Sequence, residues 1–320
     1  MVAGSQIGNL KFRLSRSHAL KLALGFAAIY LIWGSTYLAV RYTVETIPPL
    51  VAAAIRDFVA GGILFGWAWL RGFRPKREHW IAGAGIGFLF FCIGHWALNW
   101  AEQTVPSGVA ALLTATEPMF IMVFGWLAGQ QRLSRLSALG LIAGVLGVWL
   151  LTAPELSTKS TLLPGMLVVV LAAVSWAAGV TLSRKMRLPT DSLARTAMPL
   201  VCGAAMLLIA ASLTGELQQT QWVAISLRSA MALGYLTTFG SVVAFTSYMW
   251  LLQQCSPTLV ASHTYANPVV AVLLGSLFAS ESLDGRVTLA CVAILAAITL
   301  IRRGERPACS SGRQSAVWFR

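Results

Sequence analysis

Apolar runs of about 20 residues recur from one end of this chain to the other, and they limit its fold more than any other feature. Hydrophobic residues make up 57% of the 320 residues, and charged residues make up only 11%. So few polar side chains cannot cover a soluble globular protein, and disordered chains are poor in apolar residues. We therefore expect an integral membrane protein.

The apolar runs predict ten membrane spans, each bounded by charged residues, proline or glycine. Lipid offers the backbone no hydrogen-bond partner, so a span must be a helix or a barrel strand. Runs of this length without a two-residue alternation select helices. The expected spans are residues 19–40, 50–70, 80–100, 107–128, 137–153, 164–183, 194–213, 229–252, 258–279 and 285–301. The predicted fold class is an all-α polytopic membrane protein.

The Lys and Arg residues predict which way the spans face. Eighteen of the 24 fall in tails and loops that would lie on one side of the membrane, and four fall on the other. Arg56 and Arg195 lie within spans. Because cations collect in cytoplasmic loops, both chain ends are expected in the cytoplasm. The net charge of +13 is thus an orientation signal, and we expect no nucleic-acid partner.

A weak internal repeat divides the expected spans into two sets of five. A shift of 150 residues aligns these pairs without a gap: Trp100 and Trp250, Gln103 and Gln253, Thr114 and Thr264, Pro118 and Pro268, Gly125 and Gly275. An odd number of helices inverts the second half, an arrangement in which transporters bind substrate near the midplane. A packing relic of duplication is the alternative. The expected organisation is a basic cytoplasmic tail (1–18), two repeats (19–153 and 154–303) and a disordered cytoplasmic tail (304–320).

Two prolines at equivalent places predict kinks in the fourth and ninth spans. Each follows a polar residue, in the dipeptides Glu117-Pro118 and Asn267-Pro268. Proline removes an amide donor and frees the carbonyl four residues earlier, here that of Thr114 or Thr264. Free carbonyls are tolerated at membrane depth where they line a cavity or meet protein. The pair indicates a midplane site, with a packing kink as the alternative.

Glu117 is the most informative single residue, because an acid at bilayer depth costs about 2.5–3.5 kcal/mol. It should face the interior, be protonated or bind a cation. The partner position in the other half is the neutral Asn267. One titratable group at the midplane suggests either proton coupling or recognition of a substrate amine, and a structural glutamate is the alternative.

Other polar residues within the spans are expected on interior faces. His95, Asn99 and Glu102 recur at helical spacing, which predicts one polar face on the third helix. His95 would titrate near neutral pH or bond a neighbouring helix, and Glu102 is expected to be solvated among the headgroups. Arg56 and Asp57 are expected to form a local ion pair, with anion recognition as the alternative.

Small residues within the spans predict how closely the helices pack. Glycine pairs four residues apart permit close helix approach and predict packing within the chain, at Gly62 and Gly66, Gly83 and Gly87, and Gly140 and Gly144. They are weaker support for a homodimer, so a monomer or a homodimer is expected. The four histidines are widely spaced and the five cysteines form no CxxC pair, so we expect no metal and no cofactor.

Three segments resemble a known family. LIWGSTYLAVRY (31–42), VPSGVAALLTATEPMF (105–120) and SHTYANPVVAVLLGSLFASESL (262–283) are similar to segments of the drug/metabolite transporter superfamily, and more closely of its EamA-type ten-helix exporters. The resemblance covers about residues 20–303 and implies two inverted five-helix repeats, a central cavity and export of small metabolites or drugs across the inner membrane. The family often ends its fourth and ninth helices with a Gly-Glu-like pair. The second half keeps Glu281, but the first half has Gln130-Gln131.

The resemblance also places aromatic residues in the helices that line the family's cavity. These residues are Trp33, Tyr37, Trp176, Tyr248 and Tyr265. Aromatic faces hold apolar or cationic ligands, although an interface belt is the commoner role of Trp and Tyr. The full expected substrate-binding set is Trp33, Tyr37, His95, Asn99, Thr114, Glu117, Trp176, Tyr248, His263, Thr264, Tyr265 and Asn267, with helix kinks at Pro118 and Pro268.

The expected function is secondary transport of a small molecule across the bilayer by alternating access. An amine-bearing metabolite such as an amino acid would suit Glu117 and the aromatics, and a hydrophobic drug would suit the aromatics alone. Proton coupling and facilitated diffusion are both compatible with the sequence. A membrane enzyme is a rival, but the chain has no HExxH or GxSxG motif. A channel and a receptor are the other rivals.

Overall fold

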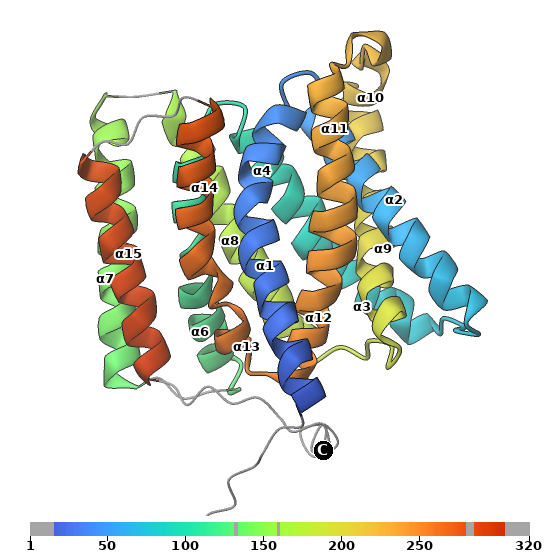
Figure 1. Cartoon of the computed structure of the whole chain (residues 1–320), viewed down its shortest axis with the longest axis horizontal. Helices are drawn as coiled ribbons and strands as arrows, with labels where there is room; N and C mark the ends of the chain where they lie inside the picture. Colours follow the sequence, from blue (N-terminus) through green and yellow to red (C-terminus); the bar gives the residue numbers. More distant parts are fainter. Residues whose placement is uncertain (1–15, 131–133, 159–160, 280–284, 305–320) are drawn as a thin grey trace, which may run out of the picture.

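The computed structural model of this chain is helical (Figure 1). It describes residues 16–130, 134–158, 161–279 and 285–304, and every secondary-structure element within these ranges is a helix. The greater part of both expected tails lies outside the described residues, as does Glu281. A helical chain agrees with the apolar runs, because a helix satisfies its own backbone hydrogen bonds in lipid.

Seven helical rods within these ranges are long and apolar enough to cross a membrane. They are α1 (Arg16–Thr43), α2 (Pro49–Leu70), the rod of α3 (Arg77–Gly87), η1 (Phe88–His95) and α4 (Trp96–Ala101), the rod of α5 (Ser107–Thr114) and α6 (Glu117–Leu127), α8 (Leu162–Ser183), α9 (Ser192–Leu213), and the rod of α11 (Leu227–Tyr235), η3 (Leu236–Ala244) and α12 (Phe245–Gln254). These rods coincide with seven of the ten expected spans.

Four further helices carry the other three expected spans. They are α7 (Arg135–Thr158), α13 (Pro257–Val260), α14 (His263–Ala279) and α15 (Gly285–Gly304), and two short elements, α10 (Glu216–Gln219) and η2 (Trp222–Ala224), follow α9. Parts of these three rods or of their side chains lie outside the described residues, so the count of ten spans stays a prediction. Figure 1 shows the start of α1 and the end of α15 at the same end of the bundle.

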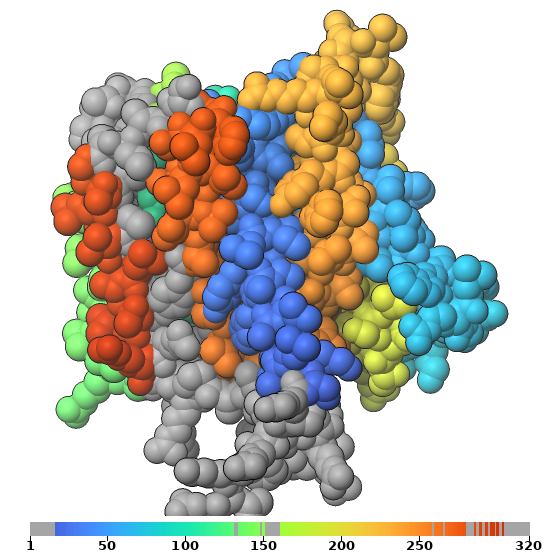
Figure 2. All heavy atoms as spheres, viewed as in Figure 1, coloured from blue at the N-terminus to red at the C-terminus, as the bar shows by residue number. Residues whose placement is uncertain are grey.

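The rods pack so that helices distant in the sequence lie side by side. α2 packs along α9, and α7 packs along α15. Figure 2 shows α1 on one broad face, between α14 and the rod of α11, η3 and α12. Many large apolar side chains are exposed on the outer surfaces, among them Trp67, Leu139 and Leu277. Such a surface suits lipid contact and not water.

Glycine allows α3 and η1 to cross α9 at backbone distance. A Cβ atom added at Gly203 would lie 2.7 Å from Cβ of Phe91 and 2.8 Å from the carbonyl oxygen of Gly87. The packing role expected for Gly83 and Gly87 agrees with this crossing. The packing role expected for Gly62 and Gly66 is wrong, because a Cβ added at either would meet no atom of the described residues within 4 Å.

Two rods contain π-helical segments, and two more are interrupted. The π-helices η1 and η3 lie in the third and eighth expected spans, and π segments are often found at functional sites. The fourth expected span is not one kinked helix, because α5 ends at Thr114 and α6 begins at Glu117, with Pro118 in its first turn. In the ninth expected span the interruption separates α13 from α14, and Pro268 lies inside α14.

Candidate functional site

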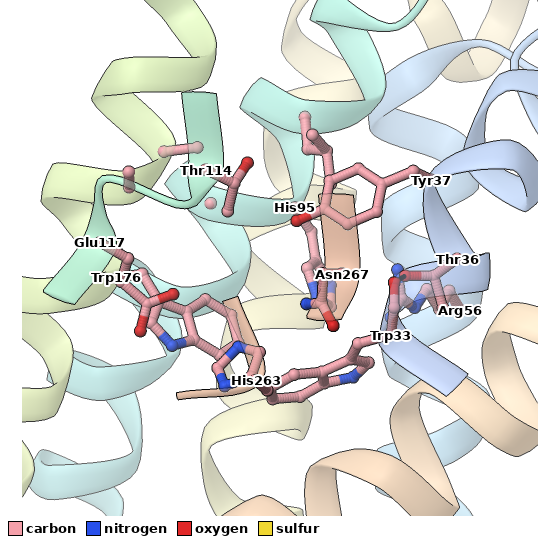
Figure 3. A pocket seen from close by; sticks show the side chains of 14 residues that line it. Trp33, Thr36, Tyr37, Arg56, His95, Thr114, Glu117, Trp176, His263 and Asn267 are labelled. Carbon is pink, nitrogen blue, oxygen red and sulfur yellow. Dashed lines mark hydrogen bonds between the residues drawn. The ribbon is translucent and has the colours of Figure 1, made fainter. Parts of the chain in front are cut away.

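A cavity of about 80 Å³ lies inside the bundle (Figure 3). Its walls come from α1, α2, η1, α4, α5, α6, α8 and α14. Eight of the twelve expected site residues line it: Trp33, Tyr37, His95, Thr114, Glu117, Trp176, His263 and Asn267. Helices from both expected halves of the chain therefore contribute to one polar and aromatic cavity.

Aromatic rings form one wall of the cavity. The ring centroid of Trp33 lies 5.8 Å from that of Trp176, at an interplanar angle of 89°, and 4.9 Å from that of His263. Nε1 of Trp33 donates to the carbonyl oxygen of Gly240 at 3.2 Å, and Nε1 of Trp176 donates to the Tyr248 hydroxyl at 3.0 Å. These hydrogen bonds fix both indoles, so the wall is formed before any ligand arrives.

Glu117 brings a carboxyl group to the cavity from the first residue of α6. Its exposed fraction is 3%, and Oε1 is buried without a hydrogen-bond partner among the described residues. Figure 3 shows the carboxyl group beside Trp176 and His263. Glu117 follows directly on the interruption between α5 and α6. A buried acid in this position is suited to binding a proton or a cationic group.

His95 is held by Asp57 and not by a residue of its own helix. Nδ1 of His95 lies 2.9 Å from Oδ2 and 3.0 Å from Oδ1 of Asp57, which is fully buried. An ionised carboxylate only accepts hydrogen bonds, so Nδ1 donates. The expected ion pair between Arg56 and Asp57 is wrong. No such pair is present among the described residues, and Nε of Arg56 donates to Oγ of Ser241 at 2.8 Å.

Three expected site residues lie outside the cavity wall and bond the protein itself. Nδ2 of Asn99 donates to the carbonyl oxygen of Pro49 at 3.2 Å, and Oγ1 of Thr264 donates to that of Ala261 at 2.9 Å. Tyr248 lies behind Trp176 and accepts its hydrogen bond. The side chain of Tyr265 lies outside the described residues.

The single polar face expected on the third span is wrong in two respects. Of His95, Asn99 and Glu102, only His95 lines the cavity. Glu102 is 2% exposed and therefore buried, whereas solvation among the headgroups was expected. His95 ends η1 and Asn99 follows in α4, so the two keep helical spacing; the difference arises because α2 offers the Pro49 carbonyl to Asn99, and a helical period does not anticipate which neighbour a residue meets.

Six further residues line the cavity: Thr36, Arg56, Gly94, Leu98, Ala172 and Ala173. The sequence does mark Arg56, because it is a charged residue seven positions into a span. Charged residues at membrane depth are rare and are often functional. The small residues Gly94, Ala172 and Ala173 contribute by leaving space. No pattern in the sequence distinguishes them from the many other small residues of the spans.

The fold and the cavity define a multi-pass helical membrane protein with an inner polar cavity. The profile of the EamA-like transporter family matches residues 20–153 and 163–303, so the chain belongs to this family. It is therefore a membrane transporter. This membership confirms the resemblance of the three sequence segments to the EamA-type drug/metabolite transporters.

Relatives cover most of the chain. It is 36% identical over 282 residues to YedA of Escherichia coli, which is described as an uncharacterized inner membrane transporter; the match covers 87% of this chain and 89% of YedA. It is 28% identical to protein PecM of Dickeya dadantii, over 85% of this chain and 89% of PecM. A solved crystal structure with 22% identity matches at a TM-score of 0.64, covering 89% of this chain and 97% of that chain, and this likeness shows the fold alone.

Proposed function

We propose that the chain is a secondary transporter of small metabolites or drugs, that it works by alternating access, and that the inner cavity is its substrate site. The observation that carries the proposal is the inner cavity, lined by residues of both halves, with a carboxyl oxygen of Glu117 in its wall that has no hydrogen-bond partner in the described part of the chain. Its volume of about 80 Å³ is below the roughly 300–1,000 Å³ of ligand pockets. Binding of a larger solute therefore requires the halves to move apart.

Reciprocal packing supports two inverted five-helix repeats, residues 19–153 and 154–303, and ten spans. The π-helix η1 packs against α8 and α9, and the π-helix η3 packs against α1 and α2. In each case the third rod of one half meets the first two rods of the other half. Two halves related by a two-fold axis in the membrane plane would make such exchanged contacts.

Two ion pairs between the halves support rocking about the cavity. Nη1 of Arg187 lies 3.1 Å from Oε2 of Glu78, and Nη1 of Arg228 lies 3.6 Å from Oε1 of Glu45. Glu45 precedes α2 and Glu78 follows it, so the two pairs lie at opposite ends of the bundle. The shift of 150 residues places Glu78 on Arg228, but it places Glu45 on Arg195 and not on Arg187, so the two pairs correspond in sequence only in part. Exposed pairs contribute only about 0–1 kcal/mol each, so either end can open.

The membrane and the orientation follow from the relatives and the charges. YedA carries the name of an inner membrane transporter, and we place this chain in the inner membrane as well. The excess of Lys and Arg favours a cytoplasmic location for both termini. Figure 1, in which α1 starts and α15 ends at the same end of the bundle, supports a common side for them. The family resemblance favours export. The polytopic enzyme and the receptor without transport activity are the alternatives.

The cavity favours a substrate with an amino group, such as an amino acid or a related amine. The acid of Glu117 suits an ammonium group, and the faces of Trp33 and Trp176 attract cations and apolar groups. Glu117 and His95 are the residues through which transport would couple to protons. A monomer or a homodimer is compatible with this account.

Flux into proteoliposomes tests the proposal. We expect radiolabelled amino acids or amines to enter vesicles that hold the purified protein and not empty vesicles. In Glu117→Gln we expect at least about a tenfold loss of apparent affinity, equivalent to 1.4 kcal/mol, together with loss of the pH dependence of flux. Glu216→Gln is the matched control, because its carboxyl group lies outside the cavity and, among the described residues, accepts a hydrogen bond from the backbone amide of Leu50 alone.

Two results would contradict the proposal. Absence of flux above empty vesicles for amino acids, amines and hydrophobic drugs would contradict transport by this chain. Unchanged affinity and unchanged pH dependence in Glu117→Gln would contradict the role given to Glu117 and leave transport itself standing.

A further inference from the structure

Arg56 presents a buried guanidinium group to the cavity. Its exposed fraction is 5%, and it lies among the residues that line the cavity from α2. Its one hydrogen bond among the described residues runs from Nε to Oγ of Ser241, at 2.8 Å. Neither Nη atom makes a hydrogen bond among the described residues, although Nη2 packs close to Gly240 of η3, so N–H donors remain that a ligand in the cavity can engage.

The neighbouring acid does not occupy these donors. Both carboxyl oxygens of Asp57 are directed at Nδ1 of His95, and no ion pair joins Asp57 to Arg56 among the described residues. A buried cation without a bonded anion is costly, and it is retained where it binds something. The planar guanidinium group matches a carboxylate through two parallel hydrogen bonds.

The second ionisable group of the cavity lies across from Arg56. Figure 3 shows Glu117 and Arg56 on opposite sides, with Trp33 and Asn267 between them. The cavity thus offers a cation at one end, an acid at the other and an aromatic surface in the middle. A ligand that satisfies both ends carries an anion and a cation on one small apolar body.

We propose that Arg56 is the residue that selects a zwitterionic substrate, by binding its carboxylate while the ammonium group faces Glu117. This inference rests on the proposed function, because it requires that the cavity binds the substrate. A simple amine would place a second cation in the cavity beside the unpaired guanidinium group. A simple carboxylate would leave Glu117 without a partner. Selection therefore arises from repulsion as well as from attraction.

The test measures flux of two radiolabelled mixtures into proteoliposomes at equal concentration. One mixture holds the common α-amino acids, and the other holds the amines that remain when each loses its carboxylate. In the wild-type protein we expect amino-acid flux to exceed amine flux at least about tenfold. In Arg56→Gln we expect amino-acid flux to fall at least about tenfold and amine flux to stay the same or rise.

Three further variants separate recognition from folding. Arg56→Lys keeps the charge and loses the planar fork, so we expect intermediate selectivity. Ser241→Ala removes the hydrogen bond that orients Arg56, so we expect it to lower amino-acid flux more than amine flux. Arg195→Gln, an arginine of α9 outside the cavity wall, is the matched control and should leave both fluxes within about twofold of wild type. If Arg56→Gln yields no folded protein, the role of Arg56 is tested by Arg56→Lys, by Ser241→Ala and by the ratio of amino-acid flux to amine flux in the wild type.

The possible failures are distinguishable. Amine flux equal to or above amino-acid flux in the wild type, with equal loss of both in Arg56→Gln and Arg56→Lys, would overturn the role of Arg56 and leave transport through the cavity intact. No flux of either mixture above empty vesicles would overturn this inference and the amine-bearing substrate of the proposed function together.

Discussion

Alanine at Gly203 should destabilise the protein, because this glycine lies where α9 crosses the segment from Gly87 to Phe91. The added Cβ would lie 2.7 Å from Cβ of Phe91 and 2.8 Å from the carbonyl oxygen of Gly87. Both neighbours belong to or adjoin the backbone, so the clash cannot be relieved by a rotamer change. Such overpacking costs about 1–3 kcal/mol, whereas the helix propensity of alanine returns at most about 1 kcal/mol.

Gly66→Ala is the matched control, because no atom in the described part of the structure lies within 4 Å of a Cβ at this position. It should be neutral or stabilise by up to about 1 kcal/mol. The two variants should therefore differ by about 2 kcal/mol, which is several degrees in apparent Tm. Thermal loss of the monodisperse peak in size-exclusion chromatography, in one detergent, measures this difference. A Tm for Gly203→Ala equal to or above that of Gly66→Ala would refute the backbone-distance crossing.

Three further predictions concern the buried pair, the ion pairs at the ends and the chain termini. Asp57→Asn should lower the free energy of unfolding by about 1–3 kcal/mol. In a double-mutant cycle of apparent Tm, its effect and that of His95→Gln should be non-additive, and additive effects would contradict a hydrogen bond between Asp57 and His95. Glu78→Gln and Arg187→Gln should each shift the accessibility of a cavity cysteine toward the same side of the membrane, by at most about fivefold, with little change in Tm. Opposite shifts from these two variants would show that the pair does not restrain that end. Tags on both chain ends should be labelled from the cytoplasmic side of the membrane, and labelling from opposite sides would contradict the inverted repeat.

The rods were predictable because the bilayer imposes a length and an apolar composition that a single sequence displays directly. Most of the cavity was predictable for a related reason. Glu117, His95 and Asn267 are polar residues at membrane depth, and such residues have few stable places other than an interior cavity. The resemblance added Trp33 and Trp176, which composition alone would assign to an interface belt.

The partners of the buried charges were not predictable, because they depend on how the rods are packed. Neighbouring residues on a helix point about 100° apart, so Arg56 and Asp57 diverge, one toward the cavity and one toward His95. Asn99 shares the helical period of a cavity residue, yet it bonds the carbonyl oxygen of Pro49 on α2. A single sequence shows neither which way Arg56 and Asp57 point nor which helix Asn99 contacts.

In alternating access the cavity opens to each side of the membrane in turn. Thr36 lines the cavity and carries no charge, so a single cysteine can be placed there after the five native cysteines are replaced. We predict that a membrane-impermeant thiol reagent labels Thr36→Cys from either side of the bilayer, and that a transported solute slows both reactions. Labelling from one side only, at a rate that no transported solute changes, would contradict the account.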